Sequence, residues 1–189
     1  MQFKTLLALP VLSGLAAAAP AADAAAKTPG PFQILALRSA SDIHFATVNA
    51  AKSSLFLHLP HSNATCDTKS DGAATFSLTE DGEVYLYSTD NPPQKLFADR
   101  SGMGQGKLGY LTGAQPPPKN GETKGWVIDK DGNLSLDGAS LLACPNSIEG
   151  AWSIWVSAGV ANPAGNEGCL GFSARTTEVE KPNSCTYTQ

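Results

Sequence analysis

Cysteines are the first residues in this sequence whose number and spacing could do chemistry. There are four, Cys66, Cys144, Cys169 and Cys185. No Cys-x-x-Cys or His-x-x-x-His spacing accompanies them, so a zinc site is not predicted. An even count in an oxidising compartment predicts two disulfides, for which three pairings are open. Among these we favour Cys144 with Cys169 and Cys66 with Cys185.

Catalytic patterns are absent around the other reactive side chains. A glycosidase needs two carboxylates that converge on one cleft, and the 17 acidic residues form no such motif. No G-x-S-x-G elbow marks a serine nucleophile. The three histidines (His44, His58 and His61) have no surrounding motif either. We therefore expect a protein that is not an enzyme and has no cofactor and no bound metal.

A glycine-rich stretch, RSGMGQGKLGY at residues 100–110, contains the spacing G-x-G-x-x-G. A dinucleotide fingerprint would need a strand before it and a helix beginning at its end. Here the residues KLGYLT continue with the alternation of a strand. The glycines are therefore interpreted as serving a turn or a close backbone contact, not a phosphate site.

The N-terminus reads as a secretory signal peptide over residues 1–18, with Lys4, an apolar run and a small-residue cleavage pattern. Residues 19–31 are rich in Ala and Pro and are expected to be a disordered leader. No transmembrane or lipid anchor is predicted. The sequence therefore predicts a secreted protein, and we expect it to be a monomer.

The charge balance argues against nucleic acid as a partner, as the lack of a predicted anchor argues against a membrane. The whole chain carries 13 basic and 17 acidic residues, and removal of Lys4 with the signal peptide gives 12 − 17 = −5. The basic residues are scattered and form no stripe interleaved with aromatics. Neither nucleic acid nor a membrane is an expected partner.

Short segments of alternating apolar residues, separated by Gly, Pro, Asn and Asp, fill residues 32–189. No window of ten or more residues keeps a helical period. The sequence predicts one all-β domain of about twelve short strands, at residues 32–38, 43–48, 54–59, 74–79, 83–88, 94–99, 107–112, 125–130, 133–138, 140–145, 152–157 and 169–175.

Two of these segments repeat each other at a distance of 50 residues. The stretches FSLTEDGEVYL (76–86) and WVIDKDGNLSL (126–136) share an aromatic residue, an Asp-Gly pair and a final Leu. Asp81-Gly82 and Asp131-Gly132 suit hairpin turns. A third unit at residues 152–175 has a suitable length but no such pair. Three hairpin units favour a β-trefoil-like closed arrangement, and a β-sandwich is the alternative.

Several strings of the sequence prompt a resemblance. ALRSASDIHFATVNA, LFADRSGMGQGKLGYLTGAQ, GWVIDKDGNLSLDGASLLACP, GAWSIWVSAG and NPAGNEGCLGFSAR resemble a family of small secreted proteins of filamentous fungi labelled IgE-binding proteins, which is similar to the cell wall protein PhiA group. The resemblance implies a place in the cell wall or medium and recognition by host IgE. For the PhiA group it implies a part in the development of spore-bearing cells. Asp42 stands where the opening motif is expected to have proline.

Two kinds of surface site are predicted from single residues. Asn63 and Asn133 begin N-glycosylation sequons. Tyr85 and Tyr87 share one face of their strand, and Trp155 faces away from its apolar neighbours, so these three are candidate carbohydrate contacts. Aromatic residues that merely cover the core are the alternative interpretation.

The sequence predicts a secreted, non-catalytic protein with a structural or interaction role, and the resemblance implies a place in the fungal cell wall and an allergen of the IgE-binding type. A lectin-like protein that binds wall polysaccharide is the alternative. Wall polysaccharide, wall proteins and host IgE are its expected partners.

Overall fold

The computed structural model describes residues 29–189, and the expected signal peptide and most of the expected leader lie outside the described residues. These described residues form fourteen strands and two 3-10 turns. They are β1 (Phe32–Leu37), β2 (Val48–Ala51), β3 (Ser54–Leu57), β4 (Thr65–Cys66), β5 (Thr75–Leu78), β6 (Val84–Leu86), β7 (Gln94–Asp99), β8 (Lys107–Thr112), β9 (Trp126–Ile128), β10 (Asn133–Leu136), β11 (Leu141–Cys144), η1 (Ile148–Gly150), β12 (Trp152–Val156), η2 (Pro163–Gly165), β13 (Leu170–Glu178) and β14 (Cys185–Thr186). Within this part of the chain no helix is long and apolar enough to span a membrane.

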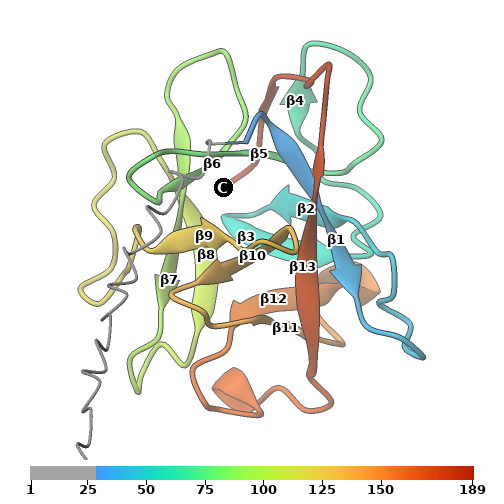
Figure 1. Ribbon diagram of the computed structural model, residues 1–189, viewed down its shortest axis with the longest axis vertical. Coiled ribbons are helices and arrows are strands. Elements are labelled where there is room, and N and C mark those ends of the chain that lie inside the picture. The colour runs from blue at the N-terminus through green and yellow to red at the C-terminus, as the bar shows by residue number, and fades with distance from the viewer. Residues whose placement is uncertain (1–28) are drawn as a thin grey trace, which may run out of the picture.

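Nine of the strands close into an antiparallel barrel. Its order is β1-β5-β6-β7-β8-β3-β12-β11-β13, and β13 returns to β1. That last pairing runs over six residues, from Phe32 opposite Glu178 to Leu37 opposite Ser173. Figure 1 shows the blue N-terminal strand β1 beside the red strand β13, so the two ends of the domain close the ring. Closure leaves the nine strands without a free edge along most of their length.

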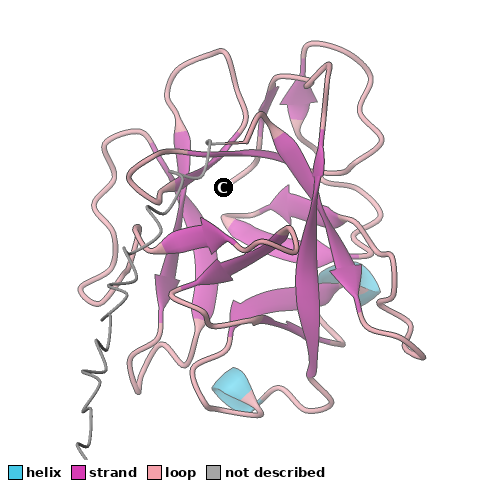
Figure 2. Ribbon diagram, viewed as in Figure 1, coloured by secondary structure: helices cyan, strands magenta, loops and turns pink. Residues whose placement is uncertain are grey.

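Strand alternation fills the barrel with side chains. In β1 every second residue is buried. Burial alternates in the same way in β10, where Leu134 and Leu136 are the buried residues. The largest buried side chains include Phe32, Phe76, Trp126 and Tyr110, each exposed by 1% or less. The sheets of Figure 2 therefore surround one packed core and not a channel.

Five strands lie outside the ring. β2 pairs with β3, the β9–β10 hairpin pairs with β13 through β10, and β14 pairs with β4 in a separate two-stranded sheet. β9 is the last strand of its sheet, and no strand of residues 29–189 pairs with its other side. The repeated hairpins of the sequence thus have different places, since β5–β6 lies in the ring and β9–β10 outside it.

The all-β class and the closed arrangement agree with the sequence-based prediction, but the threefold arrangement is not found. Four successive strands, β5 to β8, lie side by side in the ring, whereas the second hairpin of the repeat is attached to β13. Three equivalent hairpin units cannot describe such a ring. A sandwich of two open sheets does not describe it either.

The predicted strand at residues 43–48 is wrong. Residues 41–45 form a turn, and the following strand is β2. Phe45 has a φ of 64° and is 64% exposed. The N–H of Phe45 donates to the Ala36 carbonyl, and the N–H of Ala36 donates to the Ala46 carbonyl. Phe45 and Ala46 therefore both oppose Ala36, which is a β-bulge. The bulge reverses the alternation of side chains expected from the sequence.

Both disulfides have the pairing favoured from the sequence. Cys66 bonds to Cys185 and joins β4 to β14, and Cys144 at the end of β11 bonds to Cys169 just before β13. The first bond spans 119 residues and the second 25. Each bond restrains the unfolded chain, and the longer loop gains more.

The C-terminal residues enter the mouth of the barrel. The side chain of Gln94, 2% exposed, donates to the carbonyl of Tyr187 and accepts from its N–H. The hydroxyl of Tyr187 accepts from the N–H of Thr75, and the hydroxyl of Tyr110 donates to the carbonyl of Thr188. The buried amide of Gln94 thus satisfies the backbone N–H and C=O of Tyr187, which a neighbouring strand would otherwise do.

The glycine-rich stretch forms the turn between β7 and β8, as interpreted from the sequence. A Cβ at Gly109 would come within 2.6 Å of the Ser53 carbonyl oxygen, and Gly106 packs against the backbone of Val156 with a φ of 94°. These glycines allow close approach of neighbouring backbones. No helix follows them, because β8 begins at Lys107.

Candidate functional site

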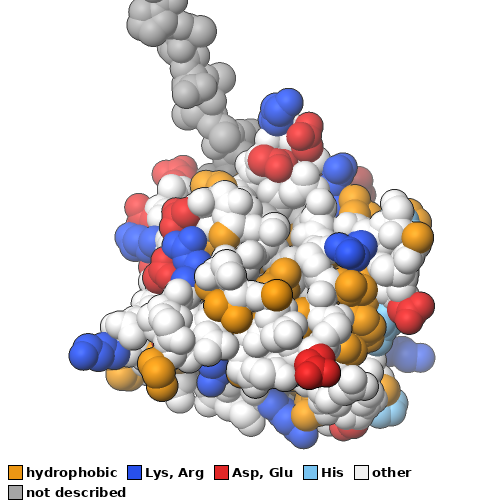
Figure 3. Space-filling model, turned by 90° about the horizontal axis from the view of Figure 1, so that it is seen from below, with side chains coloured by type: hydrophobic (Ala, Val, Ile, Leu, Met, Phe, Trp, Pro, Cys, Tyr) orange, Lys and Arg blue, Asp and Glu red, His pale blue; other side chains and the backbone are white. Residues whose placement is uncertain are grey.

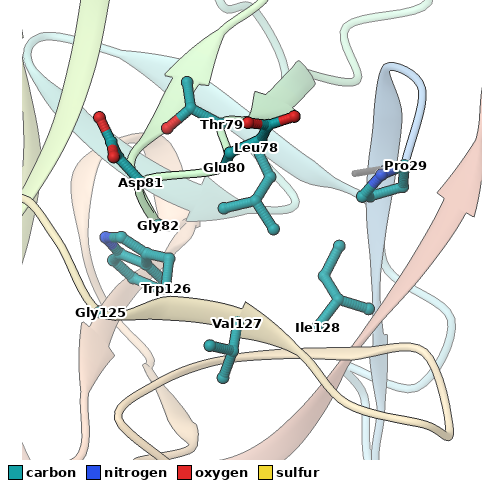
Figure 4. Close-up of a pocket in the computed structure, with 10 residues that line it drawn as sticks. All are labelled: Pro29, Leu78, Thr79, Glu80, Asp81, Gly82, Gly125, Trp126, Val127 and Ile128. Carbon is teal, nitrogen blue, oxygen red and sulfur yellow. The ribbon is translucent and has the colours of Figure 1, made fainter. Parts of the chain in front are cut away.

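The two repeated hairpins meet at a groove, which is the candidate site. It has a volume of about 410 Å³ and lies between the β5–β6 turn and β9. In Figure 4, Leu78 and Ile128 reach toward each other across it, and Pro29 lies at one side. Leu78 and Ile128 are equivalent positions of the 50-residue repeat. The repeat therefore supplies both apolar walls.

Both hairpins use the same turn. The N–H of Gly82 donates to the Thr79 carbonyl, and the N–H of Gly132 donates to the Asp129 carbonyl. Each glycine has a positive φ, of 73° and 78°, as a turn followed by a bulge requires. The side chain at the first turn position accepts in both cases, from Glu83 N–H at Thr79 and from the equivalent N–H at Asp129.

The free edge of β9 faces the groove. The N–H of Asp129 donates to the Asn133 carbonyl, which makes the neighbouring pair, Ile128 and Leu134, a non-hydrogen-bonded one. The N–H and C=O groups of Ile128 therefore point away from β10 and toward the groove. Within residues 29–189 no backbone partner is found for the Ile128 N–H.

The end of β5 offers a second free edge. The N–H of Thr79 donates to the Glu83 carbonyl, so Leu78 and Val84 also form a non-hydrogen-bonded pair. The backbone groups of Leu78 point away from β6, beyond the end of the pairing between β1 and β5. The groove is therefore bounded by main-chain donors and acceptors from both hairpins.

Trp126 forms one wall of the groove. Its side chain is buried, and its backbone N–H donates to the Gly82 carbonyl at 3.1 Å, which joins the two hairpins. The indole Nε1 is buried and has no hydrogen-bond partner within the described residues. Figure 4 shows this nitrogen turned toward Asp81 and Gly82. A buried donor without an acceptor costs about 1–3 kcal/mol.

Acidic side chains stand at the rim of the groove. Glu80 and Asp81 are exposed, and Asp81 lies 3.8 Å from the Lys124 ammonium. The ion pairs found among residues 29–189 do not include Glu80. Elsewhere the charges are mixed, and Figure 3 shows acidic and basic side chains interspersed on one face. The groove thus combines an apolar interior with an excess of negative charge.

An ion-pair network centred on Arg100 holds the C-terminal end of β10. The Arg100 guanidinium donates to the Glu122 carboxylate, to Asp137 and to the Leu136 carbonyl. The hydrogen bond from Arg100 holds the pKa of Glu122 below its usual value, although partial burial opposes this. The network ties the end of the β9–β10 hairpin to β7.

Tyr85, a predicted carbohydrate contact, is half-buried on the outer face of β6. Its hydroxyl donates to Glu83 at 2.9 Å, and the Lys95 ammonium lies 5.9 Å from its ring centre. Burial and the bond to Glu83 raise the pKa of Tyr85 to about 12. Burial raises the pKa of Glu83, but the bonds from Tyr85 and Lys95 outweigh it and lower the value. Tyr87 is also half-buried, just beyond the end of β6.

Trp155 lies far from these tyrosines. Tyr85 is opposite Lys95 of β7, and Trp155 is opposite Lys107 of β8. Their positions differ by four residues along the strands, and β12 is three strands away from β6 across the pairing of β8 with β12. Strand geometry makes the separation roughly 20 Å. The three aromatic residues therefore do not form one site.

Trp155 does line a hollow of its own, of about 250 Å³. Polar side chains surround it, among them Ser147, Lys107 and Asn166. The indole Nε1 of the half-buried Trp155 donates to the Ser153 hydroxyl at 3.0 Å. An aromatic face beside hydroxyl, amide and ammonium groups is the chemistry that sugar rings require.

The two sequons have different surroundings. Asn63 is exposed in the loop before β4, with a φ of 51°. The Asn133 amide nitrogen donates to the Asp129 carboxylate at 3.2 Å, and its oxygen accepts from Arg175 at 3.1 Å. A glycan on Asn133 would compete with this hydrogen bonding, whereas one on Asn63 would extend into solvent.

The histidines and acidic residues that the structure describes do not gather into a metal-binding cluster. No group of three or more His, Cys, Asp or Glu within residues 29–189 is placed to hold a metal ion. His44 accepts from the N–H of Arg38, and His58 bonds to the Asp42 carbonyl. These contacts give both histidines structural partners in the turn before β2.

The groove was missed by the sequence-based prediction. The signal was present, because the repeat makes Leu78 and Ile128 equivalent and places an Asp-Gly turn in each hairpin. The sequence could not show that the two hairpins lie side by side, because this depends on the pairing of β10 with β13.

Comparison with known proteins gives one family throughout. The family model described as "PhiA-like secreted protein" matches residues 32–188. The chain is 53% identical to the cell wall protein phiA of Aspergillus niger over 188 residues, which is all of this chain and 99% of the relative. It is 51% identical to that of Aspergillus fumigatus over the full length of both, and 49% identical to that of Emericella nidulans over 93% of this chain and 96% of the relative. No solved structure matches this chain.

Proposed function

The chain belongs to the PhiA-like secreted protein family, and from this premise we propose that it is a non-catalytic protein of the fungal cell wall with a structural or interaction role. The observation that carries the proposal is the identity of about half of all residues, over the full length, to relatives named cell wall protein phiA. A closed barrel with two disulfides suits this setting, because it offers proteases few flexible segments.

The test is fractionation of a fungal culture that expresses the tagged protein. Medium, washed walls and cell interior are compared, with a secreted protein of similar size and no wall affinity as the control. The proposal expects the protein in the wall fraction at a clear excess over the control. A distribution equal to that of the control would contradict it.

Lectin-like binding of wall polysaccharide is the second candidate, and the Trp155 hollow favours it. Trp155→Ala should abolish retention on the glycan that is bound, and Ser153→Ala, which removes only the partner of the indole, should reduce it. Tyr85→Phe serves as the matched control, since the Tyr85 hydroxyl is already engaged by Glu83. Absence of retention on chitin and β-1,3-glucan by the unchanged protein would exclude this function.

Recognition by host IgE is proposed only on the resemblance stated above. An exposed turn held by backbone hydrogen bonds, such as the one that presents Phe45, is a suitable epitope, because little conformational entropy is lost on binding. Binding of IgE from sensitised sera to the folded protein, compared with the reduced and unfolded protein, tests this. Equal absence of binding to both would contradict it.

A further inference from the structure

Two hollows on the outer side of the barrel join into one furrow. The Trp155 hollow, of about 250 Å³, is lined by Ser54 and Lys107. A second hollow, of about 330 Å³, is lined by the same two residues and continues to Lys52 and Gln115. Together the two hollows fall in the range of about 300–1,000 Å³ that is typical of ligand sites. The furrow therefore has room for a chain of more than one sugar ring.

The furrow is positively charged in a chain whose formal net charge is −4. Lys107 lies at the junction of the two hollows, and Lys52 lines the second. Among the described residues that line the two hollows there is no aspartate or glutamate. The two ammonium groups also outnumber the carboxylate of the last residue, Gln189, which lines the second hollow. This local excess of positive charge favours an anionic ligand.

Trp155 adds an aromatic surface beside Lys107. The two residues are directly opposite each other in the pairing of β12 with β8, so their side chains share one face of the sheet. The hydrogen bond from the indole Nε1 to the Ser153 hydroxyl holds the ring beside its own strand. Ser54 and Asn166 add a hydroxyl and an amide to the lining. A ring face, polar partners and cations together suit an acidic sugar, whereas an acidic peptide needs no aromatic partner.

Lys52 is held in a strained turn at the edge of the furrow. The β2–β3 hairpin turns on Lys52 and Ser53, whose φ values are 48° and 54°. Such a two-residue turn favours Asn-Gly, because a left-handed backbone is unfavourable for most other residue types. The N–H groups of Lys52 and Ser53 donate to the hydroxyl and the carbonyl of Thr188, which fix the turn. Residues kept in such a conformation cluster at ligand-binding sites.

We propose that this furrow binds a linear acidic polysaccharide, with one sugar ring stacked on Trp155 and with carboxylate or phosphate groups of the chain paired with Lys107 and Lys52. Lys107 pairs with the acidic group beside the stacked ring, and Lys52 pairs with one further along the chain. Binding at this site does not depend on retention of neutral wall polysaccharides, because charge selects the ligand.

The direct test is calorimetric titration of the purified secreted protein with hexasaccharides. Oligogalacturonate supplies carboxylates, and phosphorylated mannan fragments supply phosphates. Neutral β-1,3-glucan and chitin hexamers are the controls for charge, and polyglutamate is the anionic control without sugar rings. At least one acidic glycan should bind roughly tenfold more tightly than all three controls. The acidic probe that binds identifies the source of the anionic group.

Variants separate binding from folding. Lys52→Asn should weaken binding of the acidic glycan roughly threefold to fivefold. The same change should raise the urea midpoint of unfolding, because Asn tolerates the left-handed turn. Lys107→Gln should weaken binding to a similar extent, and Trp155→Ala should abolish it. Lys130→Gln, which removes an exposed lysine of the β9–β10 turn, is the matched control and should leave the affinity unchanged.

Any of four outcomes overturns the proposal. Neutral hexamers can bind as tightly as the acidic glycans, in which case the second candidate function stands and the selection by charge fails. Polyglutamate can bind as tightly, which makes the furrow a general polyanion site. Lys130→Gln can weaken binding as much as Lys52→Asn does. Neither acidic glycan can bind at all, a result that leaves the wall location to the separate test by fractionation.

Discussion

The β5–β6 and β9–β10 hairpins share a sequence pattern but not a place in the fold. Both have a buried aromatic residue at the same position, Phe76 and Trp126, and both turn on an Asp-Gly pair. The first hairpin has ring neighbours on both sides, β1 and β7. Among the strands that the structure describes, the second pairs with β13 alone and leaves the other edge of β9 unpaired. The local pattern therefore determines the hairpin, and the pairing with distant strands determines its role.

The two hairpins differ in how their backbone and indole groups find hydrogen-bond partners. In the ring, backbone groups and apolar side chains are satisfied by the next strand. Outside the ring, the repeat leaves Ile128 with outward backbone groups, and the indole nitrogen of Trp126 has no hydrogen-bond partner among residues 29–189. The groove therefore lies where a repeated element lacks a strand neighbour among the described residues.

The largest expected difference between the hairpins concerns their buried aromatics. Phe76→Ala should lower the free energy of unfolding by about 4 kcal/mol, because it leaves a cavity beside Phe32 in the ring. Trp126→Phe should lower the free energy of unfolding by less than about 1.5 kcal/mol, since it also removes a buried donor that has no partner among residues 29–189. Urea unfolding measures both, and a larger loss for Trp126→Phe would show that the indole nitrogen is satisfied.

The second prediction concerns the ion-pair network that holds the outer hairpin. Arg100→Ala should cost about 1 kcal/mol, because these charges are partly exposed. Amide exchange should accelerate in β9–β10 and not in β5–β6. Equal acceleration in both hairpins would mean that the network stabilises the whole barrel.

The same network predicts a pH dependence. Arg100 lowers the pKa of Glu122, so the contribution of this pair is fully present above the unfolded pKa of glutamate. It is lost as the pH falls through the folded pKa. Stability of the unchanged protein should therefore decline more between pH 5 and pH 3 than that of Arg100→Ala. Parallel curves would contradict the assignment.

A smaller effect distinguishes the turns themselves. Asp129 accepts from the backbone N–H groups of Asn133 and Asp131, which lowers its pKa, whereas Thr79 plays the same part without a charge. Amide protection in the β9–β10 turn should fall as the pH falls through the pKa of Asp129, and that in the β5–β6 turn should not. Asp129→Asn should remove the difference.

The smallest effect is expected at the sequons. Asn63→Gln should change the free energy of unfolding by less than about 0.5 kcal/mol, because the side chain is exposed. Peptide mapping should find a glycan on Asn63 and none on Asn133, whose amide is held by Asp129 and Arg175. A fully occupied Asn133 would show that the outer hairpin tolerates loss of those bonds.

Local structure was largely predictable from the sequence, and long-range structure was not. β7 and β8 begin and end at the predicted residues because their alternation is regular. The two-residue strands β4 and β14 were missed, since they pair only where Cys66 meets Cys185. The prediction at residues 43–48 failed because Phe45 adopts a left-handed conformation that its residue type disfavours. Ring order and the groove depend on strand partners that no local pattern specifies.

Among the candidate carbohydrate contacts, alternation correctly put Tyr85 and Trp155 on outer faces, but it could not give their separation. Only the pairing of β12 with β8 places Trp155 beside Lys107 and its hollow. The sequence thus identified residues, and the closed ring assigned them to separate surfaces.

Binding of the purified mature protein to isolated fungal walls tests the central claim, a wall protein with an interaction role, most directly. The account predicts saturable retention that survives washing and that reduction and unfolding abolish. Retention no greater than that of an unrelated acidic protein of the same size would contradict it.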